Sequence, residues 1–163
     1  PKFIDLVLEL KPEQVTLVPD SIEAITSNAG WNTIKYKDFL TDVIKTFKQA
    51  GIRTSIFVDP DPIMIRGAAE VGTDRIELYT ESYAANYELN KEKAIQPFIE
   101  AAKSATELGI GINAGHDLSL DNIEYFAKNI PNLLEVSIGH ALISEALYLG
   151  LDNVVNMYLH RLK

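Results

Sequence analysis

The chain has no cysteine, which excludes disulfide bonds, thiolate metal sites and cysteine nucleophiles. No apolar run approaches the ~18 residues that span a bilayer, so we expect neither a membrane span nor a secretion signal. Basic residues are in the minority, with 15 Lys and Arg against 23 Asp and Glu and a formal net charge of -8. Nucleic-acid binding requires a basic face and is not expected. These absences favour a soluble cytoplasmic protein. Small phosphorylated ligands stay open, because helix N-termini bind phosphate without an excess of Lys or Arg.

Short apolar runs alternate with amphipathic segments along the chain. The runs predict strands at residues 14–18, 53–58, 75–80, 109–116 and 134–140. The amphipathic segments predict helices at 3–10, 36–50, 62–71, 91–108 and 121–129, and from 141 to the last residue. A long loop is expected from Pro19-Asp20 to about residue 35, and a polar loop between 80 and 91.

Strands separated by helices predict a parallel α/β sheet with right-handed crossovers. Five strands fit an open doubly wound sheet, or about five of the eight strands of a (β/α)8 barrel, which usually takes about 250 residues. Because the sequence opens on a helix with no strand before it, we favour the incomplete barrel. No linker-like or low-complexity stretch divides the chain, so residues 1–163 are expected to form a single partial barrel domain.

Two of the three histidines directly follow a glycine at the end of a predicted strand, in Gly115-His116 and Gly139-His140. At the catalytic rim of an α/β protein, such a glycine lets the backbone turn, and the next side chain is presented to a ligand. His116 suits acid–base chemistry, because histidine titrates near neutral pH. Its alternative role is to cap a helix that begins near Ser119. At Gly139-His140 the first N–H groups of a helix favour an anion, and the alternative is a tight turn that needs glycine.

Glu77 lies inside a predicted strand and shares a face with Arg75 and Tyr79. In a barrel this face points into the closed interior, so Glu77 is expected inside it near the rim. A carboxylate in that position must be paired or do acid–base work. Acid–base work and a structural ion pair with a neighbouring arginine are equally compatible with the spacing.

Other polar clusters have simpler explanations. No His-Glu-x-x-His run or third spaced ligand supports a metal site. Asp59 and Asp61 are explained by a turn at the end of a strand and a helix cap. Trp31 lies in the long loop, where it either closes over a ligand or packs the loop down, and we expect packing.

Four segments resemble the pyridoxine 5′-phosphate synthase family: QVTLVPD at 14–20, RIELYT at 75–80, INAGHDLSL at 112–120 and VSIGHALI at 136–143. The similarity extends over essentially the whole chain in order. It implies a (β/α)8 barrel that joins 1-deoxy-D-xylulose 5-phosphate to 3-amino-2-oxopropyl phosphate, with loss of water and phosphate. It also implies that no metal or organic cofactor takes part, and that the partners are small phosphorylated substrates and identical subunits, typically in an octamer.

The resemblance also assigns roles to individual residues. His116 matches the family's proton-donating histidine, and Glu77 matches a buried glutamate that steadies charged intermediates. Gly139 and His140 match the turn that binds the phosphate of the aminoketone substrate. Thr26 matches a threonine that contacts deoxyxylulose phosphate. These roles suit the residues, because Schiff-base formation, enolisation and dehydration all need proton transfer.

The sequence departs from the family pattern at several positions. Asp117 stands where the family commonly has glycine. Its carboxylate is therefore expected beside a phosphate site, and we predict that Asp117 is a substrate-binding residue. Tyr79-Thr80-Glu81 replaces a common His-Thr-Gly, and residues 28–32 replace Glu-Gly-Gly-Leu-Asp. We interpret these differences as a subtype. The family's first three strands, which carry two general bases and most of the arginines, have no counterpart here. The chain is therefore expected to be the C-terminal two-thirds of an enzyme, without turnover of its own.

Two other functional classes compete with this prediction. A non-catalytic phosphate-binding or assembly module would fold as an open sheet and recognise anions only. A phospho-receiver domain also has five strands, but it needs an acidic cluster after the first strand and a lysine at the end of the last strand. His140 stands at that position instead.

Overall fold

The computed structural model describes residues 2–19 and 25–163. The described residues contain one sheet in the order β1-β2-β3-β4-β5, and every neighbouring pair of strands is parallel. The strands are β1 Gln14–Leu17, β2 Arg53–Val58, β3 Arg75–Tyr79, β4 Gly111–Gly115 and β5 Leu133–Ser137. The predicted parallel α/β sheet is confirmed, and β1 and β5 form its two edges. The expected turn at Asp20 and residues 20–24 of the expected loop lie outside the described residues.

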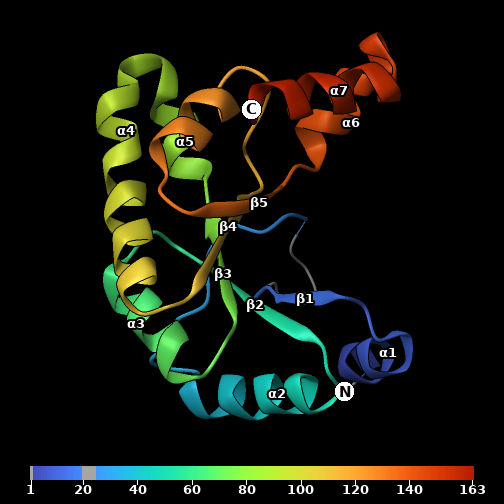
Figure 1. Cartoon of the computed structure of the whole chain (residues 1–163), viewed down its shortest axis with the longest axis vertical. Helices are drawn as coiled ribbons and strands as arrows, with labels where there is room; N and C mark the ends of the chain where they lie inside the picture. Colours follow the sequence, from blue (N-terminus) through green and yellow to red (C-terminus); the bar gives the residue numbers. More distant parts are fainter. Residues whose placement is uncertain (1, 20–24) are drawn as a thin grey trace.

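Helices follow one another around the outside of this sheet (Figure 1). They are α1 Lys2–Leu10, α2 Lys37–Gln49, α3 Pro62–Glu70, α4 Glu81–Glu107, α5 Ile123–Asn129, α6 His140–Leu149 and α7 Leu151–Arg161. Figure 1 shows α2, α3, α4 and α5 in an arc along one face of the sheet, with α1 and the α6–α7 pair at opposite ends of that arc. This is the arrangement of a partial (β/α)8 barrel, because a doubly wound sheet has helices on both faces. None of the helices among the described residues is long and apolar enough to cross a bilayer.

The two faces of the sheet differ in chemistry. Ile56, Ile76 and Ile112 face the helices and are fully buried, in one core cluster with residues such as Phe47 and Phe98. The neighbouring positions on each strand point to the opposite face and carry mainly polar groups, including Thr16, Ser55, Glu77, Asn113, Glu135 and Ser137. The polar face corresponds to the interior of a barrel.

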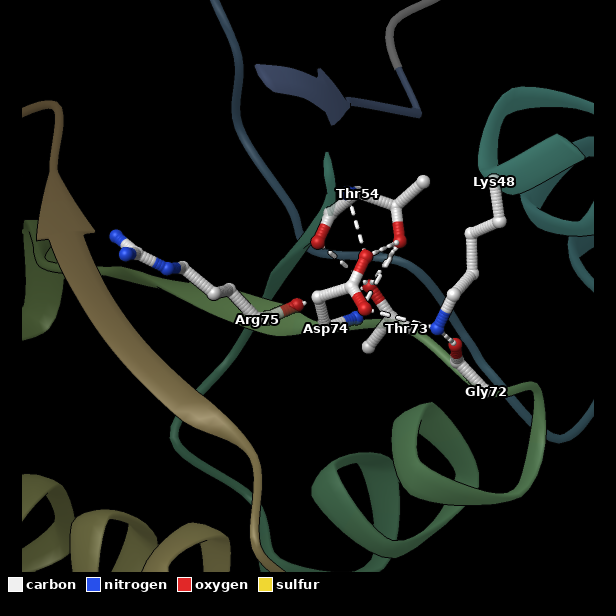
Figure 2. A network of polar contacts seen from close by, with 6 residues as sticks. All are labelled: Lys48, Thr54, Gly72, Thr73, Asp74 and Arg75. Carbon is white, nitrogen blue, oxygen red and sulfur yellow. Dashed lines mark hydrogen bonds and ion pairs between the residues drawn. The ribbon is translucent and has the colours of Figure 1, made fainter. Parts of the chain in front are cut away.

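A polar network ties the amino-terminal ends of β2 and β3 together (Figure 2). The Asp74 carboxylate accepts hydrogen bonds from the Thr54 N–H at 2.8 Å and the Thr54 hydroxyl at 2.9 Å, and it pairs with Lys48 Nζ at 2.8 Å. Lys48 Nζ also donates to the Gly72 carbonyl, and Thr73 Oγ1 donates to the carbonyls of Thr54 and Arg75. This end of a barrel is ordinarily a stability face, opposite the catalytic rim.

The predicted loop between 80 and 91 is wrong, because α4 begins at Glu81. The helix is kinked at Asn90, whose φ of -165° and ψ of 92° are not helical. The Asn90 side chain accepts a hydrogen bond from the Lys93 N–H at 2.8 Å, as an N-cap does. The first part of α4 is held by Tyr83, which is fully buried and donates to the Asn122 carbonyl at 2.8 Å. The sequence between residues 80 and 91 is mainly polar, so it gave no sign that Tyr83 is buried and holds this part of the helix.

Two further boundaries differ from prediction. β5 ends at Ser137, so His140 does not end a strand but is the first residue of α6. The C-terminal helical segment breaks at Gly150, whose φ of 82° divides α6 from α7. The apolar face predicted for α1 exists, but Phe3, Leu6 and Leu10 are at least half exposed and only Val7 is buried.

Candidate active site

His116 follows the last residue of β4 and has a left-handed backbone, with a φ of 88°. A residue other than glycine occupies this region only where the surrounding structure holds it, and such residues cluster at functional sites. Here the His116 N–H donates to the Ser137 carbonyl at 3.2 Å. The buried Thr80 hydroxyl donates to the Gly115 carbonyl at 2.6 Å. The turn that presents His116 is therefore held by Ser137 of β5 on one side and by Thr80, which follows β3, on the other.

Both nitrogens of the His116 ring have partners. Nε2 lies 2.9 Å from Thr26 Oγ1, and Nδ1 lies 2.7 Å from Asp117 Oδ2. The ring also meets the Tyr79 ring edge-on, with 5.4 Å between centroids, and lies 6.2 Å from the His140 ring. The alternative role as a helix cap near Ser119 is not observed, because the Ser119 N–H donates to the Asn122 side chain.

Glu77 lies on the polar face of β3 and is only 8% exposed. Burial raises the pKa of Glu77, although hydrogen bonds from Thr16 and Ser137 and the nearby His116 lower it in part. Thr16 Oγ1 donates to Glu77 Oε2 at 3.3 Å. Arg75, the neighbouring arginine on this strand, pairs instead with Glu135 at 2.8 Å. Glu77 is thus a buried carboxylate held by hydroxyl groups.

A cavity of about 420 Å³ lies at the carboxyl ends of the strands. Glu77, His116, Gly139 and His140 line it, together with Val18, Ser27, Phe57, Ser137 and Ile138. Four of the six predicted site residues therefore share one cavity. The other two, Thr26 and Asp117, are hydrogen-bonded to the His116 ring. In α/β barrels the active site occupies this end of the strands.

Gly139 and His140 form the start of α6, where the first N–H groups have no partner within the helix. The φ of Gly139 is -105°, and a Cβ built on it would meet nothing within 4 Å. Crowding within the described residues therefore does not require glycine at this position. An open backbone at a helix N-terminus suits an anion that approaches closely.

Sequence reasoning missed the supporting groups of this cavity. Ser137 and Thr16 contact Glu77 from β5 and β1, and Phe57 lies 5.1 Å from Tyr79 between ring centroids. Their only signal was the alternation that places them on the polar face. Trp31 packs against Tyr36 and Phe39, so the expectation of packing is met. Among residues 2–19 and 25–163, no group of three or more His, Asp and Glu side chains is placed to hold a metal ion.

Comparisons with known proteins identify the family of this chain. The sequence matches the family described as Pyridoxal phosphate biosynthesis protein PdxJ over residues 1–163. The chain belongs to this family. It is 70% identical over 161 residues to the pyridoxine 5′-phosphate synthase of Flavobacterium johnsoniae, covering 99% of this chain and 68% of that protein. It is 61% identical over 158 residues to the synthase of Bacteroides thetaiotaomicron, covering 97% of this chain and 67% of that protein.

A more distant likeness concerns the fold alone. The crystal structure of the BexX/CysO complex from Amycolatopsis orientalis superposes with a TM-score of 0.59 at 15% sequence identity. The match covers 97% of this chain and 59% of that one. The chain thus spans about two thirds of the length of the two synthases, and its match covers 59% of the Amycolatopsis orientalis chain.

Three of the residues at which this chain was expected to depart from the family pattern, Tyr79, Thr80 and Asp117, lie around His116. The Tyr79 ring packs against the His116 ring, and Asp117 is hydrogen-bonded to it. Thr80 binds the Gly115 carbonyl and also accepts a hydrogen bond from the Asp117 N–H at 3.2 Å. These three residues therefore surround the turn that presents His116.

Proposed function

We propose that this chain supplies catalytic side chains of a pyridoxine 5′-phosphate synthase. The reaction condenses 1-deoxy-D-xylulose 5-phosphate with 3-amino-2-oxopropyl phosphate to give pyridoxine 5′-phosphate, phosphate and water, without a metal or organic cofactor. One observation carries the proposal: Glu77, His116, Gly139 and His140, from two strand ends and a helix start, line the same cavity.

His116 is the proton-transfer group in this proposal. Its ring lies at the cavity wall between a hydroxyl and a carboxylate, so it can take up a proton on one nitrogen while the other stays hydrogen-bonded. Ring closure requires protons to move between an amine, a carbonyl oxygen and a departing hydroxyl. A neutral imidazole carries one donor and one acceptor nitrogen, so it can both give and take a proton.

Glu77 stabilises positive charge that develops on a protonated imine. A buried carboxylate acts more strongly on such charge than an exposed one, because the surrounding medium screens it less. Its hydroxyl partners Thr16 and Ser137 hold it without neutralising it, which leaves its charge available to the substrate.

The phosphate of the aminoketone binds at the start of α6. The N–H groups that follow Gly139 point out of the helix and favour an anion. Thr26, on the other side of His116, contacts deoxyxylulose phosphate. The two substrates then meet at His116, between their binding groups.

The same proposal includes a homo-oligomer, an octamer by family resemblance, and a cytoplasmic location. Self-association is supported by apolar side chains exposed on α6 and α7, where Leu147 is 81% and Tyr148 is 89% exposed. Exposed apolar surface of this kind commonly marks an interface. The cytoplasm is supported by the substrates, since small phosphorylated metabolites do not cross membranes unaided.

The test is product formation from both phosphorylated substrates. It uses this chain alone and this chain mixed with the part of the Flavobacterium johnsoniae enzyme to which it does not align. We expect pyridoxine 5′-phosphate and inorganic phosphate in equal amounts from the mixture, and loss of both with His116→Ala. Binding of either substrate without product in both preparations would overturn the synthase proposal and favour a phosphate-binding module.

A further inference from the structure

The side chains of His116 and Asp117 contact each other although the two residues are adjacent in sequence. Successive side chains of an extended strand point to opposite faces. The left-handed φ of 88° at His116 breaks this alternation and brings Nδ1 to 2.7 Å from Asp117 Oδ2. Thr26 Oγ1 lies 2.9 Å from the opposite nitrogen. A hydroxyl, an imidazole and a carboxylate are thus connected through the two nitrogens of one ring.

The backbone of Asp117 is anchored on both sides. Its N–H donates to Thr80 Oγ1 at 3.2 Å, and its carbonyl accepts from Asn122 Nδ2 at 3.3 Å. Thr80 is fully buried and Asn122 is 6% exposed, so the anchors belong to the packed interior. The contact between the two side chains follows from this fixed backbone and not from a freely rotating surface residue.

We propose that Asp117 is a positioning residue that selects the tautomer of His116. An ionised carboxylate only accepts hydrogen bonds, so Nδ1 of the neutral ring must carry the proton. Nε2 then presents its lone pair toward Thr26, whose hydroxyl or a substrate hydroxyl donates to it. When Nε2 takes up a proton, the carboxylate stabilises the resulting imidazolium and stays ionised. The role of this tautomer in turnover rests on the proposed function.

This role differs from substrate binding. A carboxylate beside a phosphate group would repel it, whereas Asp117 Oδ2 is engaged by the His116 ring. The other titratable groups around the ring are Glu77 on β3, Tyr79 at the end of β3 and His140 on α6. Among the hydrogen bonds of the described residues, Asp117 is the acidic partner of this ring.

The direct test is the ¹⁵N spectrum of the histidine side chains of the whole chain at about pH 8.5, roughly two units above the ordinary histidine pKa. We expect His116 in the wild type to show a protonated Nδ1 and an unprotonated Nε2. Asp117→Ala should shift the population toward a protonated Nε2, and Asp117→Asn should shift it less, since an amide oxygen still accepts. Asp121→Ala, which removes an exposed carboxylate nearby, should leave the His116 signals unchanged.

A wild-type His116 with the proton on Nε2 would overturn the proposal whatever the variants do. So would an unchanged tautomer in Asp117→Ala. In the turnover assay we expect Asp117→Ala to lower kcat at least about tenfold with little change in KM, as loss of an orienting partner does. Absence of turnover in the mixture that contains the wild-type chain would contradict only the proposed function, because the tautomer is measured independently of activity.

Discussion

A Cβ at position 115 would lie 3.0 Å from Glu77 Oε1 and 2.5 Å from the Ser137 carbonyl oxygen. Gly115 is therefore the residue that makes room for the buried carboxylate beside β4. We expect Gly115→Ala to destabilise the fold by about 1–3 kcal/mol, since the backbone of β5 must move to accept the methyl group. Urea unfolding measures the change. An unchanged unfolding midpoint would contradict this account of the close packing.

Gly139→Ala is the matched substitution at a second strand-to-helix junction. A Cβ there meets nothing within 4 Å, so stability should change by no more than about 0.5 kcal/mol. Binding of the phosphorylated aminoketone should weaken at least about tenfold, because the methyl group keeps the phosphate from the helix N-terminus. Isothermal titration calorimetry with that substrate measures the affinity. An unchanged affinity would show that Gly139 does not contribute to phosphate binding.

Glu77→Gln should raise stability at neutral pH. Burial raises the pKa of Glu77 in the folded state, so the folded chain holds this proton more tightly than the unfolded chain. Wild-type stability therefore falls as pH rises through the window between the unfolded and folded pKa values. The extra free energy of unfolding of Glu77→Gln relative to the wild type should be complete above that window and absent below about pH 4. Urea unfolding across this range measures it, with Glu9→Gln, an exposed carboxylate on α1, as the control.

Asp74→Asn should lower stability at neutral pH. Partial burial alone would raise the pKa of Asp74, but the Lys48 ammonium and the Thr54 donors outweigh it and lower the pKa. The contribution is thus present above the unfolded pKa and is lost as pH falls through the folded one. We expect a loss of about 1 kcal/mol at pH 7, less than the usual contribution of about 1.5–3 kcal/mol for a charged hydrogen bond, because the side chain is one-third exposed.

Urea unfolding at low pH can contradict this explanation of the Asp74→Asn effect. A difference between Asp74→Asn and the wild type that persists at about pH 2, below the ordinary carboxyl pKa, would show that charge is not the cause. Turnover should be unaffected by Asp74→Asn, since this network lies at the amino-terminal ends of β2 and β3, opposite the cavity.

The fold was predictable where local pattern and packing agree. Alternation in β3 placed Glu77 on the polar face, and Asp61 caps α3 through the Ile63 N–H as its sequence predicted. The helical start of α4 was not predictable, because it depends on one tyrosine whose partner Asn122 is 39 residues away. The contact between Thr26 and His116 spans 90 residues and has no signal in spacing. The pairing of Asp117 with His116 depends on a backbone angle that sequence does not reveal.

The measurement that tests the central claim most directly is chemical rescue at His116. His116→Gly removes the ring, and we expect formation of pyridoxine 5′-phosphate to fall at least about a hundredfold in the mixture that is active with the wild type. Added imidazole should restore part of that rate, and His160→Gly on α7 should not change it. A His116→Gly variant that keeps wild-type turnover would contradict the claim that this histidine transfers the proton.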